Sequence, residues 1–275
     1  MPVATINNHQ IHYETHGSGP PLLLIHSFIC STDMWRPQIE HLANSYRVIA
    51  MDIRGHGQSG PSQPHSLYDL VDDALGVLDA EGVESAVWLG LSIGGMVSMR
   101  AALRAPDRVQ GMVLLATDAK SESFLVKIER RGLAQIVKHL GILPVIIPVL
   151  RKMFGSRAHR QQRELINTWR EKFLKVDTDS MLESLEALLT RDNVSRKLRT
   201  VRVPTLIMHG KQDRAIPVKL AKNTKKHLGQ QADLRLLKGV GHLMTLEDPA
   251  EVNIQISYFL SRLNLTPARE AEASP

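Results

Sequence analysis

A short glycine-rich motif places one serine where it can act as a nucleophile. Residues 90–95 read Gly-Leu-Ser-Ile-Gly-Gly, a G-x-S-x-G pattern between an apolar run at 86–91 and a helical pattern at 93–106. A turn of this kind holds the serine in a strained backbone conformation and exposes its hydroxyl at a helix N-terminus, and glycines on both sides make the turn sterically feasible. The alternative is a chance match on a Gly/Ser turn. The strand–turn–helix context favours Ser92 as the nucleophile of an acyl-transfer reaction.

A serine nucleophile needs a base within hydrogen-bond reach and an acid that orients the base. His242, in Val-Gly-His-Leu-Met, follows the last predicted strand, and a surface-loop histidine is the alternative interpretation. Asp213 follows another predicted strand, in a Gly-x-x-Asp turn that precedes Pro217. Asp118 also follows a strand and is the rival acid. The order Ser92, Asp213, His242 is the one that accompanies this serine motif, so we predict that these three side chains form a triad.

Two backbone amides are the candidates for stabilising the oxyanion that forms during acyl transfer. One is the amide of Ile93, directly after the serine, at the start of a predicted helix. The other is the amide of Phe28, in the loop His-Ser-Phe-Ile that follows the apolar run at 21–26.

The rest of the chain indicates a parallel sheet that would bring these loops together. Continuous apolar runs, typical of strands buried on both faces, occupy 21–26, 46–52, 86–91, 109–117, 205–210 and 233–238. Helical patterns at 33–43, 67–82, 93–106 and 251–263 alternate with them. Residues 3–6 and 11–15 read as a hairpin with its turn at Asn7-Asn8. We therefore predict an α/β fold with a mostly parallel, doubly wound sheet.

The alternation of strands and helices stops between about 119 and 200. Residues 120–202 hold 18 Lys/Arg and 9 Asp/Glu, so this segment carries a net charge of +9 against +6 for the whole chain. We predict an α/β core over 1–118 and 201–265, a helical cap inserted at 119–200 before the acid-bearing strand, and a disordered tail at 266–275.

Composition excludes several other classes of protein. The chain of 275 residues has one cysteine, so it cannot form an intramolecular disulfide. Its start lacks the pattern of a signal peptide, and it has no apolar run long enough to span a membrane. We found no nucleic-acid-binding motif and no zinc-ligand spacing. We expect a cytoplasmic protein with a small-molecule substrate, no nucleic-acid partner and no metal or organic cofactor; monomer and homodimer both stay open.

Taken together, these motifs resemble the α/β-hydrolase superfamily of serine hydrolases. The resemblance rests on the oxyanion loop, on Asp-Ile-Arg-Gly-His-Gly-Gln-Ser at 52–59, on the serine motif, and on the Asp213 and His242 loops. Within the superfamily the N-terminal half is similar to 3-oxoadipate enol-lactonases and small esterases, whose oxyanion loops also tend to read His-Ser. The cap is longer and more basic than that subgroup implies. A metal- or phosphate-binding role for 52–59 is the alternative to the structural turn that the resemblance implies.

The resemblance implies a carboxylesterase that works through an acyl-enzyme. The alternatives on the same triad are opening of an enol-lactone, hydrolysis of a carbon–carbon bond in a vinylogous diketone, and perhydrolysis. An alternative from another class is a small-ligand receptor that keeps the triad but turns over little substrate. Haloalkane dehalogenases are disfavoured because they use aspartate at the position of Ser92.

The apolar, proline-broken stretch at 140–154 leaves three interpretations of the cap. It is a kinked helix packed over the pocket, a lid whose apolar side contacts lipid or an acyl chain with cations at its edge, or a basic surface that attracts anionic substrates. The residues predicted to line the substrate pocket are His26, Phe124, Phe154, Trp169 and Leu243.

Overall fold

The core of the protein is an eight-stranded sheet. This computed structural model describes residues 3–265, and the predicted tail at 266–275 lies outside them. The strands are β1 (Val3–Ile6), β2 (His9–His16), β3 (Pro21–Ile25), β4 (Arg47–Met51), β5 (Ala86–Leu91), β6 (Val109–Leu115), β7 (Thr205–Gly210) and β8 (Ala232–Leu237). Their order across the sheet is β1-β2-β4-β3-β5-β6-β7-β8. The six strands β3 to β8 run parallel to one another. The predicted doubly wound, mostly parallel sheet is confirmed.

The two ends of the sheet differ from its centre for physical reasons. β1 and β2 form the predicted antiparallel hairpin, and both turn residues have positive φ (Asn7 50°, Asn8 63°), which asparagine tolerates better than most residues. β8 was expected to be buried on both faces, and this was wrong. It pairs on one side only, with β7, so Asp233 and Arg235 reach solvent from an edge strand.

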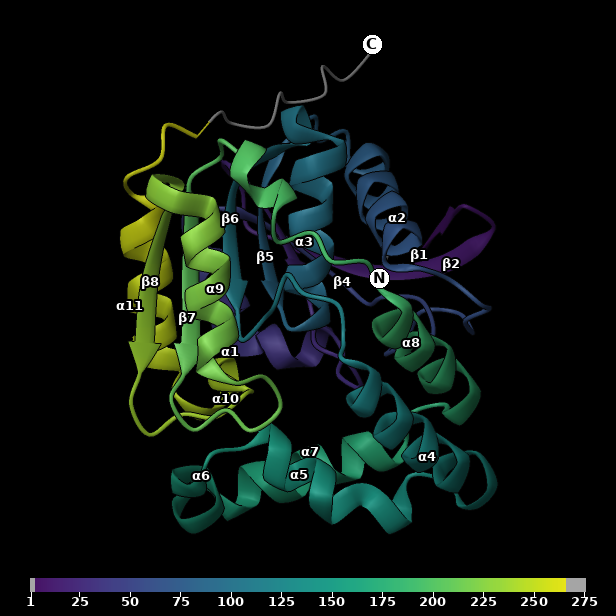
Figure 1. The fold of residues 1–275 in the computed structure, drawn as a ribbon. Helices are drawn as coiled ribbons and strands as arrows, with labels where there is room; N and C mark the ends of the chain where they lie inside the picture. Colours follow the sequence, from purple (N-terminus) through teal and green to yellow (C-terminus); the bar gives the residue numbers. More distant parts are fainter. Residues whose placement is uncertain (1–2, 266–275) are drawn as a thin grey trace.

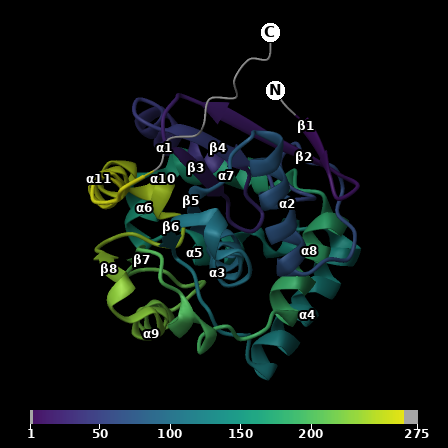
Figure 2. The same cartoon turned by 90° about the horizontal axis from the view of Figure 1, so that it is seen from above.

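Helices cover both faces of the sheet (Figures 1 and 2). The helices α2 (Leu67–Ala80), α3 (Ile93–Arg104) and α9 (Val218–Leu228) contribute to one hydrophobic cluster, and α1 (Arg36–Leu42) and α11 (Pro249–Leu260) contribute to the other. Because the two clusters lie on opposite faces, the parallel strands are buried on both sides and their carboxyl ends meet at one edge of the sheet. Figure 1 shows the cap beyond that edge.

The cap is a helical insertion between β6 and β7. It contains α4 (Phe124–Leu140), η3 (Leu143–Val145), α5 (Ile146–Met153), α6 (Ser156–Gln161), α7 (Arg163–Leu174), α8 (Thr178–Thr190) and η4 (Lys197–Thr200). The stretch at 140–154 is broken rather than kinked, because Gly141 (φ 70°) ends α4. Pro144 and Pro148 then fall in the first turns of η3 and α5, where no amide donor is needed. None of the helices within 3–265 is long and apolar enough to cross a membrane.

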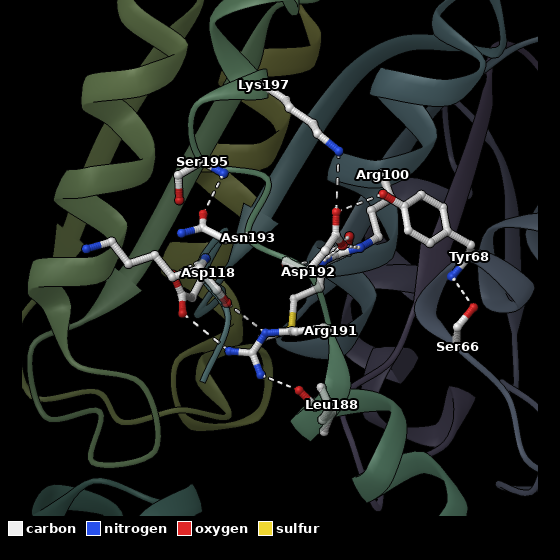
Figure 3. Close-up of polar contacts among 12 residues, drawn as sticks. Ser66, Tyr68, Arg100, Asp118, Leu188, Arg191, Asp192, Asn193, Ser195 and Lys197 are labelled. Atoms are coloured by element: carbon white, nitrogen blue, oxygen red, sulfur yellow. Dashed lines mark hydrogen bonds and ion pairs between the residues drawn. The ribbon is translucent and has the colours of Figure 1, made fainter. Parts of the chain in front are cut away.

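The C-terminal end of the cap is attached to the core by a polar cluster around Asp192 (Figure 3). Arg100, a buried residue of α3, donates from Nη2 to Asp192 Oδ1 at 2.7 Å, and the hydroxyl of Tyr68 in α2 donates to Asp192 Oδ2 at 3.1 Å. Lys197 Nζ lies 3.6 Å from the same carboxylate. The end of the insertion is therefore fixed to two core helices.

Candidate active site

Ser92 lies at the turn between β5 and α3 in a strained conformation. Its φ and ψ are 56° and −111°, in a region that non-glycine residues rarely adopt. The turn is tight enough that a Cβ atom on Gly90 would overlap the backbone of Gly94, and one on Gly94 would overlap the carbonyl oxygen of Ile25. The two glycines of the motif are therefore needed for close backbone approach.

Contacts from β6 hold this turn in place. The Ser92 amide donates to the carbonyl of Leu115 at 2.9 Å. The hydroxyl of Thr117 donates to the Ser92 carbonyl at 2.6 Å. Thr117 was not predicted from the sequence, because a threonine after a strand carries no signal of a bond to a residue 25 positions earlier.

Asp213 and His242 form a buried pair. His242 Nδ1 donates to Asp213 Oδ2 over 2.8 Å, and the other carboxylate oxygen accepts the amides of Ala215 (2.8 Å) and Ile216 (2.9 Å). Burial alone would raise the pKa of Asp213, but the charge of His242 and the hydrogen bonds from His209 and His242 lower it to well below its usual range. Asp213 is therefore ionised at neutral pH and holds the ring of His242 with Nε2 free to accept a proton.

The rival acid, Asp118, has other partners. Its Oδ1 accepts the amide of Lys120 at 2.8 Å, and Oδ2 lies 3.4 Å from Arg191 Nη2 (Figure 3). Arg191 also donates to the carbonyls of Lys120 and Leu188. Asp118 thus belongs to a cluster that fixes the beginning of the cap to its end, and Asp213 is the acid beside His242.

His209, at the end of β7, contacts this Asp213–His242 pair and was not predicted from the sequence. Its ring is fully buried, and Nε2 lies 3.2 Å from Asp213 Oδ2 and 2.8 Å from the carbonyl of Ile216. The Nε2–H group therefore bonds both the carboxylate and the loop that carries it. Its position four residues before Asp213, at a strand end, was the only signal in the sequence.

Glu247, at the end of α10 (Met244–Glu247), connects the histidine loop to the cap. Its side chain is 2% exposed and accepts the amides of Gly241 (3.1 and 3.0 Å) and of Gly155 (3.0 Å). The amides of His242 and Leu243 both donate to the carbonyl of Met153, at 3.1 and 3.0 Å. Burial raises the pKa of Glu247 to about 7 even though these bonds oppose the shift. We call these contacts the Glu247 bridge.

The predicted oxyanion loop after β3 is also fixed by the core. His26 Nε2 accepts the amide of Ile53 at 3.0 Å, so the Nδ1–H group donates to the carbonyl of Ser27 at 2.7 Å. Ile29, in the same loop, has a positive φ of 56°. Ser27, Phe28 and Ile29 all line the cavity that contains Ser92. The Phe28 amide stays a candidate donor together with that of Ile93.

The segment 52–59 forms structural contacts. The Asp52 carboxylate accepts the amides of Thr32 (2.7 Å) and Gln58 (2.9 Å) and lies 2.9 Å from His12 Nδ1. His56 is buried and its Nδ1 lies 3.2 Å from the carbonyl of Arg54. Over residues 3–265 no group of three or more His, Cys, Asp or Glu side chains is arranged to hold a metal ion.

A cavity of about 220 Å³ opens at Ser92 and extends under the cap. Ser92 and His242 both line it. Most of its wall is apolar and comes from the inner sides of α4, η3, α5 and α8; the cap residues involved are Leu133, Ala134, Val137, Ile142, Val145, Pro148, Val149, Met153, Met181, Leu182, Leu185 and Leu188. Charged side chains of Glu122, Arg130, Lys152 and Arg191 also reach it. No hydrogen bond joins Ser92 Oγ to His242 within the described residues, and such bonds commonly form only with substrate bound.

The residues predicted to line the pocket lie elsewhere. His26, Phe154, Trp169 and Leu243 are packed in the interior, with exposed fractions of 3% or less, and are not part of the lining of the Ser92 cavity. Phe124 is 75% exposed on the outside of the cap. Aliphatic residues of α4, α5 and α8 line the cavity in their place.

Comparison with known proteins agrees with this architecture. Residues 20–138 match the family described as alpha/beta hydrolase fold. The chain is 33% identical, over 79% of its length and 82% of the relative, to a protein of Azorhizobium caulinodans named "Putative carbamate hydrolase RutD". The chain belongs to the α/β-hydrolase family.

Two solved structures are similar over nearly the whole chain. The enol-lactonase from Burkholderia xenovorans superposes with a TM-score of 0.88 at 25% identity, covering 94% of this chain and 100% of that one. A thermophilic esterase from Thermogutta terrifontis has a TM-score of 0.89 at 26% identity, with coverages of 94% and 97%. The predicted resemblance to enol-lactonases and esterases is confirmed.

Proposed function

We propose that this protein is a serine hydrolase that cleaves carboxylic esters through an acyl-enzyme, with Ser92, His242 and Asp213 as its triad. The observation that carries the proposal is the 2.8 Å hydrogen bond between Asp213 and His242, with His242 lining the same cavity as the strained Ser92. A nucleophile on a tight turn and a base oriented by a buried carboxylate are the two requirements of this chemistry.

In the first half-reaction the Ser92 hydroxyl attacks the carbonyl carbon of the ester while His242 Nε2 takes its proton. Negative charge then develops on the carbonyl oxygen, where the amides of Phe28 and Ile93 are proposed to donate hydrogen bonds. When the tetrahedral intermediate collapses, the alcohol leaves with the proton that His242 carried, and the acyl group stays on Ser92.

In the second half-reaction a water molecule attacks the acyl-enzyme. His242 takes a proton from the water, the same two amides stabilise the new oxyanion, and the proton returns to Ser92 as the carboxylic acid leaves. Asp213 stays ionised throughout, since its pKa lies well below its usual range, and its role is to orient His242 and to stabilise the imidazolium.

Because the wall of the cavity is mostly apolar, we propose that the acyl group is the part of the substrate that binds under the cap. A lactone is the second candidate substrate, because the enol-lactonase of Burkholderia xenovorans matches the chain over 94% of its length. Lactone opening uses the same steps, with the leaving alcohol still attached to the acyl group.

Hydrolysis of p-nitrophenyl esters, from acetate to laurate, tests the proposal. We expect activity that Ser92→Ala lowers by on the order of 10⁴-fold or more, with an unchanged melting temperature. Ser98→Ala is the matched control, because Ser98 lies in the helix that follows Ser92 and its hydroxyl donates to the carbonyl of Gly94. Retained activity in Ser92→Ala would contradict the nucleophile assignment. Activity on an enol-lactone but on no linear ester would favour the second candidate.

A further inference from the structure

The exposed apolar side chains of the protein are concentrated on one part of the cap. Of the eleven large hydrophobic residues that are exposed within 3–265, eight lie between residues 124 and 147. They are Phe124, Leu125, Ile128, Leu133, Ile136, Leu140, Leu143 and Ile147, with exposed fractions from 39% to 77%. We call this set the α4 face. Soluble proteins rarely expose large apolar patches without a function for them, so the concentration requires an explanation.

The helix α4 has two different sides. Its inner side carries Arg130, Ala134 and Val137, which line the cavity that contains Ser92. Its outer side carries Leu125, Ile136 and Leu140, whose spacing of eleven and four residues places them on one stripe of the helix. Figures 1 and 2 both show α4 at the outer edge of the molecule. A single helix therefore separates the catalytic cavity from an exposed apolar surface.

Cations border the α4 face. Residues 124–152 contain six Lys/Arg and a single acidic residue, Glu129, so this stretch has a net charge of +5. Lys127, Lys138 and Arg151 form no ion pair with any other described residue. By helical spacing, Lys127 and Lys138 share a stripe at the edge of the apolar side of α4.

We infer that the α4 face binds an anionic lipid surface, with its leucines and isoleucines among the acyl chains and its unpaired cations against the head groups. An amphipathic helix of this kind lies in the plane of a lipid interface, and both apolar burial and attraction to anionic head groups contribute to binding. A second copy of this chain fits less well, because its α4 face would bring the same positive charge against this one. Bound in this way, the protein would hold the wall of its catalytic cavity against a source of acyl substrates.

Flotation with lipid vesicles tests this inference independently of catalysis. We expect the wild-type protein to bind vesicles of equal parts phosphatidylcholine and phosphatidylglycerol, to bind pure phosphatidylcholine at least tenfold more weakly, and to dissociate as salt is raised. The double variant Leu125→Ser/Leu140→Ser should bind the mixed vesicles about 100-fold more weakly. Neither residue lines the cavity, so hydrolysis of a soluble ester should be unchanged.

The matched control is Val3→Ser/Ile254→Ser, which removes two apolar side chains that are 48% and 59% exposed outside the cap. It should bind vesicles as the wild type does. The inference is overturned if the wild type fails to bind the mixed vesicles, or if this control loses binding as far as the cap variant. It is also overturned if light scattering shows a dimer that Leu125→Ser/Leu140→Ser converts to a monomer, because the face would then be a contact between copies of the chain.

Discussion

Glu247 gives the stability of this protein a dependence on pH that one substitution should remove. Burial raises the pKa of its carboxyl from an ordinary value of 4.5 to about 7. The folded state therefore holds this proton more tightly than the unfolded state does. As pH rises from about 4.5 to 7 the unfolded state loses the proton first, so the contribution of Glu247 to stability falls across that window.

The size of the effect follows from the difference between the two pKa values. At about 1.4 kcal/mol per unit, this difference corresponds to roughly 3 kcal/mol between the acidic and the basic side of the window. Glu247→Gln cannot titrate and should lack this dependence. Both backbone amides reach the same oxygen, Oε2, so the carbonyl oxygen of glutamine can accept both bonds. Its amino group replaces Oε1, the second acceptor for the Gly241 amide, which costs up to about 1 kcal/mol.

Urea unfolding of the wild type and Glu247→Gln at half-unit intervals from pH 4 to pH 8 measures this directly. Other groups titrate in both proteins, so the difference in unfolding free energy between them isolates Glu247. We expect the wild-type advantage to shrink by roughly 3 kcal/mol as pH rises through the window. Glu40→Gln, at an exposed glutamate, is the matched control. A difference for Glu247→Gln that stays constant from pH 4 to pH 8 would refute the assignment of a raised pKa.

Three further substitutions, one of them with a matched control, test the site. Asp213→Asn should lower kcat by on the order of 10³–10⁴ in steady-state ester hydrolysis with little change in KM, because the base loses its orienting charge; an unchanged kcat would contradict this role. Gly94→Ala should destabilise the protein by several kcal/mol in thermal unfolding, since its Cβ would overlap a carbonyl of β3, whereas Gly132→Ala, with open space around it, should stabilise α4 by up to about 1 kcal/mol. Thr117→Val removes the bond to the Ser92 carbonyl, so it should lower the unfolding free energy by about 1 kcal/mol and lower kcat several-fold. An unchanged kcat in this variant would contradict a positioning role for Thr117.

The sequence predicted the sheet and the pairing of Asp213 with His242 because both depend on local signals. Apolar runs mark the parallel strands, and Ser92, Asp213 and His242 each follow one of them, so the carboxyl edge of the sheet brings the three loops together. The choice of Asp213 over Asp118 also rested on a local turn. β8 was misjudged because we interpreted 233–238 as a continuous apolar run, although Asp233 and Arg235 alternate with leucines as in a strand that has one side in solvent.

The residues that were missed act over long distances along the chain. Glu247 bonds the amide of Gly155, 92 positions away, and no pattern near either residue indicates this. The pocket lining was missed for a different reason. An aliphatic residue of a cap helix shows the same periodicity whether it faces the core, a cavity or solvent, so the sequence did not distinguish Val137, a buried residue of the lining, from Leu125 on the surface.

The Glu247 bridge has a consequence for how caps can be exchanged between relatives. The loop that carries His242 bonds Met153 of the cap directly and Gly155 through Glu247, so His242, the proposed base, is partly supported by the insertion and not by the sheet alone. A graft that replaces the whole insertion would remove the acceptor for two amides of that loop and leave them buried without a partner. A graft that keeps the junction of α5 and α6 and exchanges only α4 and α8 would change the cavity wall while the base keeps its support. Substrate specificity can therefore change in modules here, provided that this junction is inherited with the core.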